Sequence, residues 1–247
     1  MIGRLPLLGI TFVGVVAFGC SAVVEGGREI DIRQQDDGCS PVSISVEPGE
    51  QVNLKVTNES GQDYEIEGTE GTELEELIIP AGRTRSVGYG VPDRAGTYKL
   101  KCYVPGGPST IIELLADPSA AEANPATESA GLPAPTPDSS ATEVVYVELF
   151  DYVIDPQRAS VAAGRIQFIA ENRSDSEVHE VAVLQVHEDG SMSNKGEIEN
   201  VPPGAGGSLT VDLTPGEYEL ACLIAEGEFN SPADHYQEGM RIRFAVE

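Results

Sequence analysis

The sequence has few basic residues: 15 Lys and Arg against 41 Asp and Glu, for a formal net charge of −26. Nucleic acids are bound largely by Lys and Arg side chains that displace counterions from the phosphates. A chain this acidic would be repelled by a phosphate backbone, so we expect no nucleic-acid partner.

Tryptophan is absent and aromatic residues make up only 6% of the 247 residues, whereas Gly (27) and Pro (17) are frequent. This composition favours a turn-rich β protein over a helical bundle. Hydrophobic residues, at 40%, are numerous enough to build a core, so the chain is globular rather than wholly disordered. Histidine is also scarce, with three residues, and this limits the metal sites that the chain can form.

The N-terminus has the features of an export signal. Arg4 precedes an apolar run from Leu5 to Gly19, which is shorter than the roughly 20 apolar residues needed to span a bilayer. The run ends in Ala-Phe-Gly-Cys, which resembles a bacterial lipobox with Cys20 as the lipid-modified residue. We expect a signal peptide over residues 1–19 and a lipidated tether over 20–28. An ordinary signal peptide or an uncleaved anchor is the alternative, and in each case the chain is exported to where thiols can oxidise.

A segment rich in Ala, Pro, Ser and Thr divides the rest of the chain. Residues 116–142 show no apolar period, which is typical of a flexible linker. The flanking stretches, 29–115 and 143–247, each have the size of a small domain.

These two stretches share five landmarks in the same order. The matched pairs are Pro41 and Pro156, Gly49 and Gly164, Asn58 and Asn172, the segments beginning at Ile79 and Val201, and the segments beginning at Gly96 and Gly216. Such a series predicts a duplicated domain.

Each copy consists of short apolar segments separated by Gly and Pro turns, with no convincing amphipathic helix. Strict alternation places Tyr218, Leu220 and Cys222 on the inward face of one strand. His179 heads a second inward row. This pattern predicts an all-β fold of two tandem antiparallel β-sandwiches.

Four side chains of the second copy form a candidate metal site: His179, Cys222, His235 and Met240. The last three follow the pattern Cys-x12-His-x4-Met. Two His and one Cys with a weak axial Met are the ligand set of a blue-copper centre. Zinc rarely uses Met, so the set favours copper.

These residues, in this order, resemble the cupredoxin (blue copper) family, and the resemblance covers nearly all of the second domain. It implies tandem Greek-key sandwiches and one type 1 copper ion that cycles between Cu(I) and Cu(II). It also implies that His235 is the ligand nearest the surface and conducts the electron outward. The sequence departs from the family in one loop: cupredoxins usually place only a few residues between the Cys and the second His, whereas twelve separate Cys222 from His235.

The first copy resembles a degenerate cupredoxin without a copper site. Tyr64 stands in the place of His179, and no second His or Met follows Cys102 within this copy. Cys39 aligns with the inward-facing Ile154, which makes it a candidate partner for Cys102. We predict a Cys39–Cys102 disulfide, and two buried free thiols are the alternative.

The ligand set predicts a membrane-tethered one-electron carrier, held by its N-terminal lipid to the outer face of a bacterial membrane, in the periplasm or at the cell surface. Its acidity would steer it to a redox partner protein with a basic docking face, although adaptation to a saline medium is an alternative explanation. A copper trafficking or storage protein and a structural or adhesive module are the alternative functions.

We do not expect an enzyme. Multicopper oxidases and copper nitrite reductases need further His-rich centres, which three His cannot supply. The remaining histidine, His187, lies beside a predicted turn, and we expect it to be solvent-exposed and not a ligand.

Overall fold

The structure is a computed structural model that describes residues 23–116 and 135–247. These residues form β-strands and one short 3-10 helix, η1 (Glu228–Asn230). The predicted signal peptide, the lipidated Cys20 and most of the predicted linker lie outside the described residues and stay predictions. No helix within the described ranges is long and apolar enough to cross a membrane.

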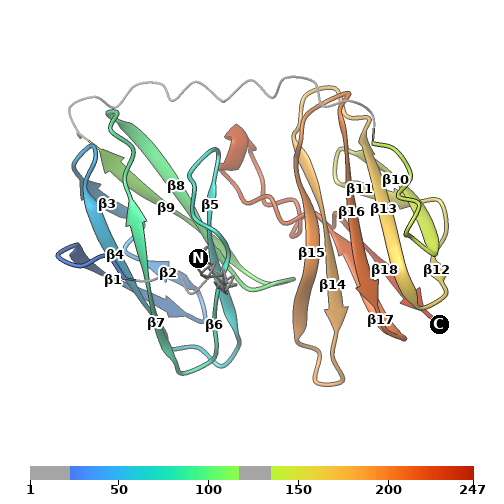
Figure 1. The fold of residues 1–247 in the computed structure, drawn as a ribbon, viewed down its shortest axis with the longest axis horizontal. Helices are drawn as coiled ribbons and strands as arrows, with labels where there is room; N and C mark the ends of the chain where they lie inside the picture. The colour runs from blue at the N-terminus through green and yellow to red at the C-terminus, as the bar shows by residue number, and fades with distance from the viewer. Residues whose placement is uncertain (1–22, 117–134) are drawn as a thin grey trace, which may run out of the picture.

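The first sandwich consists of two sheets (Figure 1). One contains, in spatial order, β2 (Gly38–Ser40), β1 (Arg28–Gln35), β4 (Gln51–Asn58) and β7 (Thr84–Gly90). The other contains β3 (Ser43–Val46), β9 (Ser109–Ala116), β8 (Gly96–Tyr103), β5 (Tyr64–Thr69) and β6 (Leu77–Ile79).

The second sandwich repeats this strand order. One sheet contains β11 (Val153–Pro156), β10 (Glu143–Phe150), β13 (Gly164–Asn172) and β16 (Gly206–Leu213). The other contains β12 (Ser160–Val161), β18 (Arg241–Val246), β17 (Gly216–Ala221), β14 (His179–Val186) and β15 (Met192–Val201). The prediction of two tandem all-β sandwiches is confirmed. Their origin by duplication stays a prediction.

The sheets are mixed, so the prediction of purely antiparallel sandwiches is wrong. β1 pairs parallel with β4 and β10 with β13, and the short edge strands β3 and β12 pair parallel with β9 and β18. The parallel pairing follows from how the chain connects β1 to β4. Between β1 and β4 the chain crosses to the opposite sheet as β3 and then returns, and such a crossover allows two strands to run in the same direction.

Each sandwich has its own core, built by period-two alternation. In β10, Val145, Val147 and Leu149 are buried and alternate with less buried side chains. Tyr218, Leu220 and Cys222 are all buried in the second core, as alternation predicts. Part of the predicted linker also contacts this sandwich, because the Gln167 amide donates to Thr136 O and its Oε1 accepts from Asp138 N.

The outer faces of two sheets, one from each sandwich, pack against each other. Tyr103 of β8 belongs to a buried cluster with residues of the second sandwich, namely Ala182, Leu184, Ala221, Leu223 and Tyr236. This contact explains why both faces of β14 are buried along most of its length. In Figure 1, the segment that contains η1 lies between the two sandwiches.

A single lysine lies at the centre of this interface. Lys101 of β8 is 2% exposed, and its Nζ lies 2.9 Å from Glu67 Oε1, 3.7 Å from Glu180 Oε1 and 3.9 Å from Glu228 Oε2. The first of these carboxylates is in the first sandwich and the other two are in the second. One ammonium group therefore faces three buried carboxylates.

Buried carboxyl groups in this interface lead us to predict that the free energy of unfolding falls as the pH rises. Burial, together with neighbouring carboxylates, raises the pKa of Glu65 to about 8 and that of Glu197 to about 9, against 4.5 for an ordinary Glu. Folding therefore favours the protonated carboxyls. Their stabilisation is complete below about pH 4.5 and is lost as the pH rises through 8 to 9. The charged groups that act on these two side chains are Glu67, Glu76, Lys101, Glu180 and Glu199.

Thermal unfolding followed by circular dichroism between pH 5 and 9, in metal-free buffer, measures this effect. We expect the midpoint to fall with pH in the native chain and to fall less in the Glu65→Gln/Glu197→Gln double variant. Glu113→Gln, at an exposed position, is the control and should keep the native slope. Equal slopes in all three proteins would contradict the prediction.

Candidate metal centre

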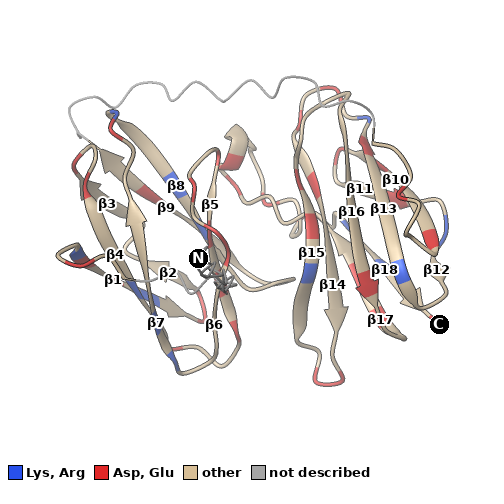
Figure 2. Ribbon diagram, in the orientation of Figure 1, with Lys and Arg blue, Asp and Glu red and all other residues tan. Residues whose placement is uncertain are grey.

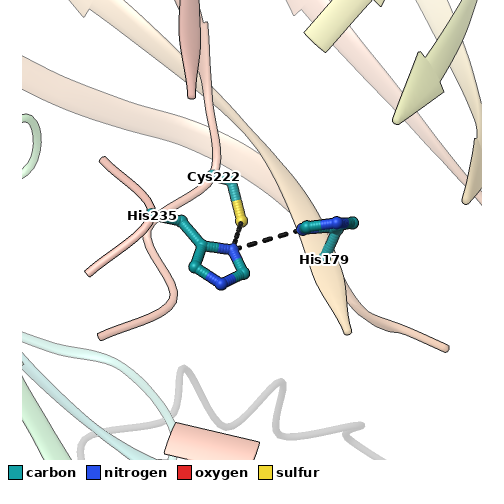
Figure 3. A group of neighbouring side chains, drawn as sticks. All are labelled: His179, Cys222 and His235. Atoms are coloured by element: carbon teal, nitrogen blue, oxygen red, sulfur yellow. Dashed lines mark hydrogen bonds between the residues drawn. The ribbon is translucent and has the colours of Figure 1, made fainter. Parts of the chain in front are cut away.

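Three of the four predicted ligands converge at one end of the second sandwich (Figure 3). His179 begins β14, Cys222 follows β17 directly, and His235 lies in the segment before β18. The Nδ1 atoms of the two histidines are 3.2 Å apart, and His235 Nδ1 is 3.3 Å from Cys222 Sγ. One ligand atom from each residue lies within 4.8 Å of the others, and all three side chains are fully buried.

A buried asparagine corner fixes the chain next to His179. The Asn172 amide donates to Glu177 O and to Val201 O, each at 2.8 Å, and its Oδ1 accepts from the backbone and hydroxyl of Ser174. Val201 in turn pairs with His179 across β14 and β15. The sequence comparison identified Asn172 as a landmark of the repeat but not its contribution to the site.

Backbone hydrogen bonds tie the other ligand segments together. Cys222 N donates to Met240 O at 3.0 Å, His235 N to Ile224 O at 2.9 Å, and Met240 N to His235 O at 3.0 Å. Met240 is fully buried and belongs to the same core cluster as Cys222. The predicted axial ligand is therefore placed beside the other three, and its coordination through sulfur stays a prediction.

The two imidazoles turn their Nδ1 atoms toward the sulfur and their Nε2 atoms away from it. His235 Nε2 lies 2.9 Å from Ser231 Oγ, which orients the ring. His179 Nε2 is buried without a hydrogen-bond partner and lies 3.9 Å from Asp151 Oδ1. A histidine that is hydrogen-bonded through one nitrogen presents the other to a metal in a fixed direction. Ser231 was not identified from the sequence.

Burial favours the neutral form of both histidines. It lowers the pKa of His179 to about 4, with a smaller contribution from His235, and it also lowers the pKa of His235. Burial raises the pKa of the Cys222 thiol well above its usual range. Neutral imidazoles are ready metal ligands, whereas the thiol must give up its proton when a metal binds. The donor set thus fits a soft cation such as copper.

The prediction that His235 lies at the surface is wrong, because its side chain is fully buried. The half-buried ring of Tyr152 meets it edge-on, with ring centroids 5.3 Å apart. The long segment after Cys222 is itself packed inward, since Leu223, Ile224 and Ala225 are all buried. His187, in contrast, is exposed as predicted.

The first sandwich holds this long ligand segment in place. Phe229 N donates to Glu70 Oε1 at 2.8 Å, and Lys99 Nζ donates to Gly227 O at 2.8 Å. Further contacts across the interface join Thr69 to Glu228, Ser109 to Asp234 and Gln237 to Gly107. Contacts with the first sandwich thus hold the twelve residues that separate Cys222 from His235 at several points.

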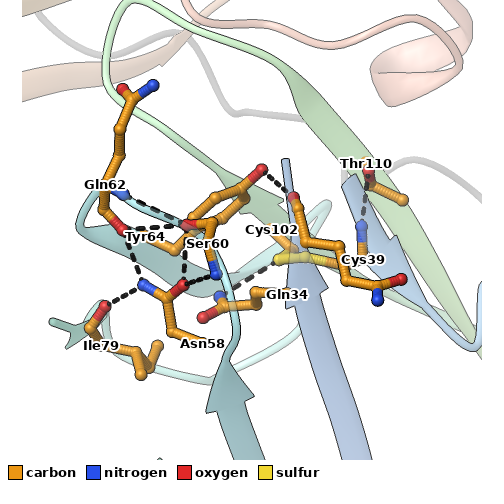
Figure 4. The surroundings of a disulfide bond; sticks show 10 residues. Gln34, Cys39, Asn58, Ser60, Gln62, Tyr64, Ile79, Cys102 and Thr110 are labelled. Carbon is orange, nitrogen blue, oxygen red and sulfur yellow. Dashed lines mark hydrogen bonds between the residues drawn. A yellow bond between two sulfur atoms is a disulfide. The ribbon is translucent and has the colours of Figure 1, made fainter. Parts of the chain in front are cut away.

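In the first sandwich a disulfide takes the place of the metal ligands (Figure 4). Cys102, the counterpart of Cys222, is bonded to Cys39, as predicted. Tyr64 stands where His179 stands in the second copy, and its hydroxyl donates to Gln35 O at 2.6 Å. The first copy therefore lacks the His-Cys-His group.

No family model matches the sequence, and no curated protein does. A reduced auracyanin from Roseiflexus castenholzii aligns with 44% of this chain and 98% of its own, at 18% identity and a TM-score of 0.34. A blue copper oxidase from Nitrosomonas europaea aligns with 90% of this chain and 86% of its own, at 16% identity and a TM-score of 0.32. A copper-containing nitrite reductase from Thermus scotoductus aligns with 90% of this chain and 62% of its own, at 10% identity and a TM-score of 0.29.

These matches correct one expectation. We expected the chain not to be an enzyme because it has only three His, yet the solved structures similar to it include a blue copper oxidase, a multicopper oxidase and a copper nitrite reductase. They align with 90%, 93% and 90% of this chain. The expectation that the chain is not an enzyme is therefore withdrawn.

Proposed function

We propose that this chain is an exported copper protein that passes single electrons to a partner protein. The convergence of His179 Nδ1, His235 Nδ1 and Cys222 Sγ in a buried cluster carries the proposal. Two imidazoles and a thiolate suit copper, and the Met240 thioether would be the weak axial ligand of a type 1 site. One copper ion held there would supply a centre that alternates between Cu(I) and Cu(II).

The chain's own residues hold the donor atoms in place and keep water away from them. Ser231 orients the His235 ring, and the Asn172 corner fixes the start of β14. Glu180 N donates to Cys222 Sγ at 3.4 Å, which favours negative charge on the sulfur. A preformed and buried site rearranges little when its charge changes, and this property favours electron transfer over ready metal exchange.

We expect the partner to dock on the surface nearest to the two histidines. Tyr152 packs against His235, and two carboxylates lie beside the site: Asp151, 3.9 Å from His179 Nε2, and Glu177, 4.0 Å from His235 Nε2. Acidic residues are also spread over both sandwiches (Figure 2). A basic docking face on the partner would complement this surface and raise the association rate at low salt.

We further propose that a lipid on Cys20 tethers the chain to the outer face of a bacterial membrane. The short apolar run and its Ala-Phe-Gly-Cys end support this placement. If the net charge of −26 serves to steer a partner, the association rate will fall with ionic strength. A rate that is independent of salt would favour adaptation to a saline medium instead.

Copper titration tests the function directly. Cu(II) is added to purified residues 21–247 and the visible spectrum is recorded. We expect an intense thiolate-to-copper band that reductant bleaches reversibly. Cys222→Ser and His235→Ala should abolish the band, whereas His187→Ala, at an exposed histidine, should leave it unchanged.

The other outcomes are equally informative. Tight Cu(I) binding without the visible band would contradict the electron carrier and favour copper trafficking or storage. A lack of stoichiometric copper would overturn the copper assignment and leave the paired sandwiches as a structural or adhesive module.

A further inference from the structure

A second group of converging ligand atoms lies between the two sandwiches. Glu67 of β5, Glu76 just before β6 and Glu197 of β15 each place a carboxylate oxygen within 4.8 Å of the others. Glu67 is buried, Glu197 is half-buried and Glu76 is exposed, so the group is accessible from solvent on one side. None of these residues belongs to the His-Cys-His group, and the three come from both sandwiches.

Two buried polar atoms on the same face, which lie across β5 and β8 from each other, make no hydrogen bond of normal geometry: Tyr103 Oη and Glu65 Oε2. Tyr103 is 1% exposed and Glu65 is 4% exposed. The register pairs Glu65 with Tyr103 and Glu67 with Lys101 across β5 and β8, so all four side chains lie on the face that meets the second sandwich. An orphaned buried oxygen costs free energy unless a ligand satisfies it.

The pKa of Tyr103 agrees with this placement. Burial raises this pKa most, and the charges of Glu67, Glu65, Glu197 and Glu76 raise it further. These charges come from the face of β5 that carries Glu65 and Glu67, and from the neighbouring Glu76 and Glu197.

Carboxylates outnumber basic groups in this part of the interface between the two sandwiches. Lys101 is shared among Glu67, Glu180 and Glu228. Among the described residues, Glu65, Glu76 and Glu197 have no basic partner within ion-pair distance, and Glu197 accepts only a 3.3 Å bond from the Asn194 amide. Carboxylates that leave water without a countercharge must either take up protons or bind a cation.

We propose that Glu67, Glu76 and Glu197 bind a hard divalent cation, with calcium as the best fit, and that this ion joins the two sandwiches. The donors are all oxygens, which suits calcium and not the soft metal of the His-Cys-His group. Calcium also tolerates irregular geometry and water ligands, as a partly exposed interface demands. Because the site exists only when the sandwiches are docked, the ion stabilises the docked chain. This inference is independent of the copper proposal.

Terbium luminescence is the first test, because Tb³⁺ replaces calcium at oxygen sites and is excited by a nearby aromatic ring. The chain has no tryptophan, so tyrosine must be the sensitiser. We expect Tb³⁺ emission on tyrosine excitation that calcium displaces. Tyr103→Phe should remove most of the emission while calcium binding, measured by calorimetry, persists.

Matched variants locate the site. Glu197→Gln and Glu76→Gln should each weaken calcium binding by about tenfold or more. Glu113→Gln, at an exposed position on β9, should bind calcium as the native chain does. Calcium should also raise the thermal midpoint of the native chain and not that of Glu197→Gln.

Two outcomes would overturn the inference. One is the absence of any heat of calcium binding and of any shift in the thermal midpoint at pH 8. The other is calcium binding that Glu197→Gln and Glu113→Gln affect equally, because the ion would then bind to the general acidic surface.

Discussion

Replacing Lys101 with Met is expected to lower the free energy of unfolding by about 3–5 kcal/mol, the range for removing one partner from a buried ion pair. The methionine side chain fills most of the space of the lysine stem but carries no charge. Glu67, Glu180 and Glu228 would then remain in the interface without the ammonium that they share. Their mutual repulsion and desolvation would oppose docking of the two sandwiches.

Urea denaturation at pH 7, followed by circular dichroism, measures this loss. Lys55→Met is the matched control, because Lys55 pairs with Glu29 and Asp31 at the surface of the same sandwich. An exposed pair is screened by water and contributes little to stability. Equal losses in the two variants would show that Lys101 does not neutralise the interface. If Lys101→Met does not fold, adding Glu67→Gln should restore folding by removing one unpaired carboxylate.

The same substitution should affect the copper site. Glu180 Oε1 accepts a hydrogen bond from Leu223 N at 2.8 Å, and Glu228 Oε2 accepts one from Ala225 N at 3.0 Å. Two of the three carboxylates that face Lys101 thus hold the backbone just after Cys222. We expect Lys101→Met to shift the visible spectrum of the copper-loaded chain and Lys55→Met to leave it unchanged.

Much of the site could be predicted because alternation along a strand determines which side chains face the core. The period of two placed Cys222 inward at the end of β17 and His179 inward at the start of β14, and both are buried there. His235 and Met240 were identified as the remaining ligands because their order and spacing resemble those of the cupredoxin family. These inferences depend on local geometry and on the chemistry of the residue types.

The packing between the sandwiches could not be predicted in the same way. Alternation along β8 places Lys101 on the outward face, and the side chain does point away from its own core, but the second sandwich covers it. Alternation identifies the face and says nothing of what lies opposite. One signal was available in the sequence: residues 181–184 are apolar at every position, which is typical of a strand covered on both sides.

The position of His235 shows the limit of the resemblance. In the family the second His lies near the surface, but here the longer segment before it folds inward and contacts the first sandwich. The inserted residues therefore bury the ligand that was expected to be exposed. A loop of this length has no counterpart in the family pattern, so its path had to come from the structure.

The second large loss of stability is expected when the Cys39–Cys102 disulfide is removed. Cys39 and Cys102 are 63 residues apart in sequence, and a crosslink over a loop of this length stabilises by about 4 kcal/mol through the unfolded chain. Cys39→Ala/Cys102→Ala should lose stability of this order, and its first sandwich should unfold at lower urea than in the native chain.

Reduction of the native chain tests the same bond without a mutation and should reproduce the loss. The contacts nearest to the bond would also weaken, because the buried Gln34 amide donates to Cys102 Sγ at 3.3 Å. Since the bond lies within the first sandwich and the ligands lie in the second, the double variant should still bind copper at Cys222. Loss of copper with unchanged urea stability would contradict this separation, and it would assign Cys39 and Cys102 to the metal chemistry rather than to the stability of the fold.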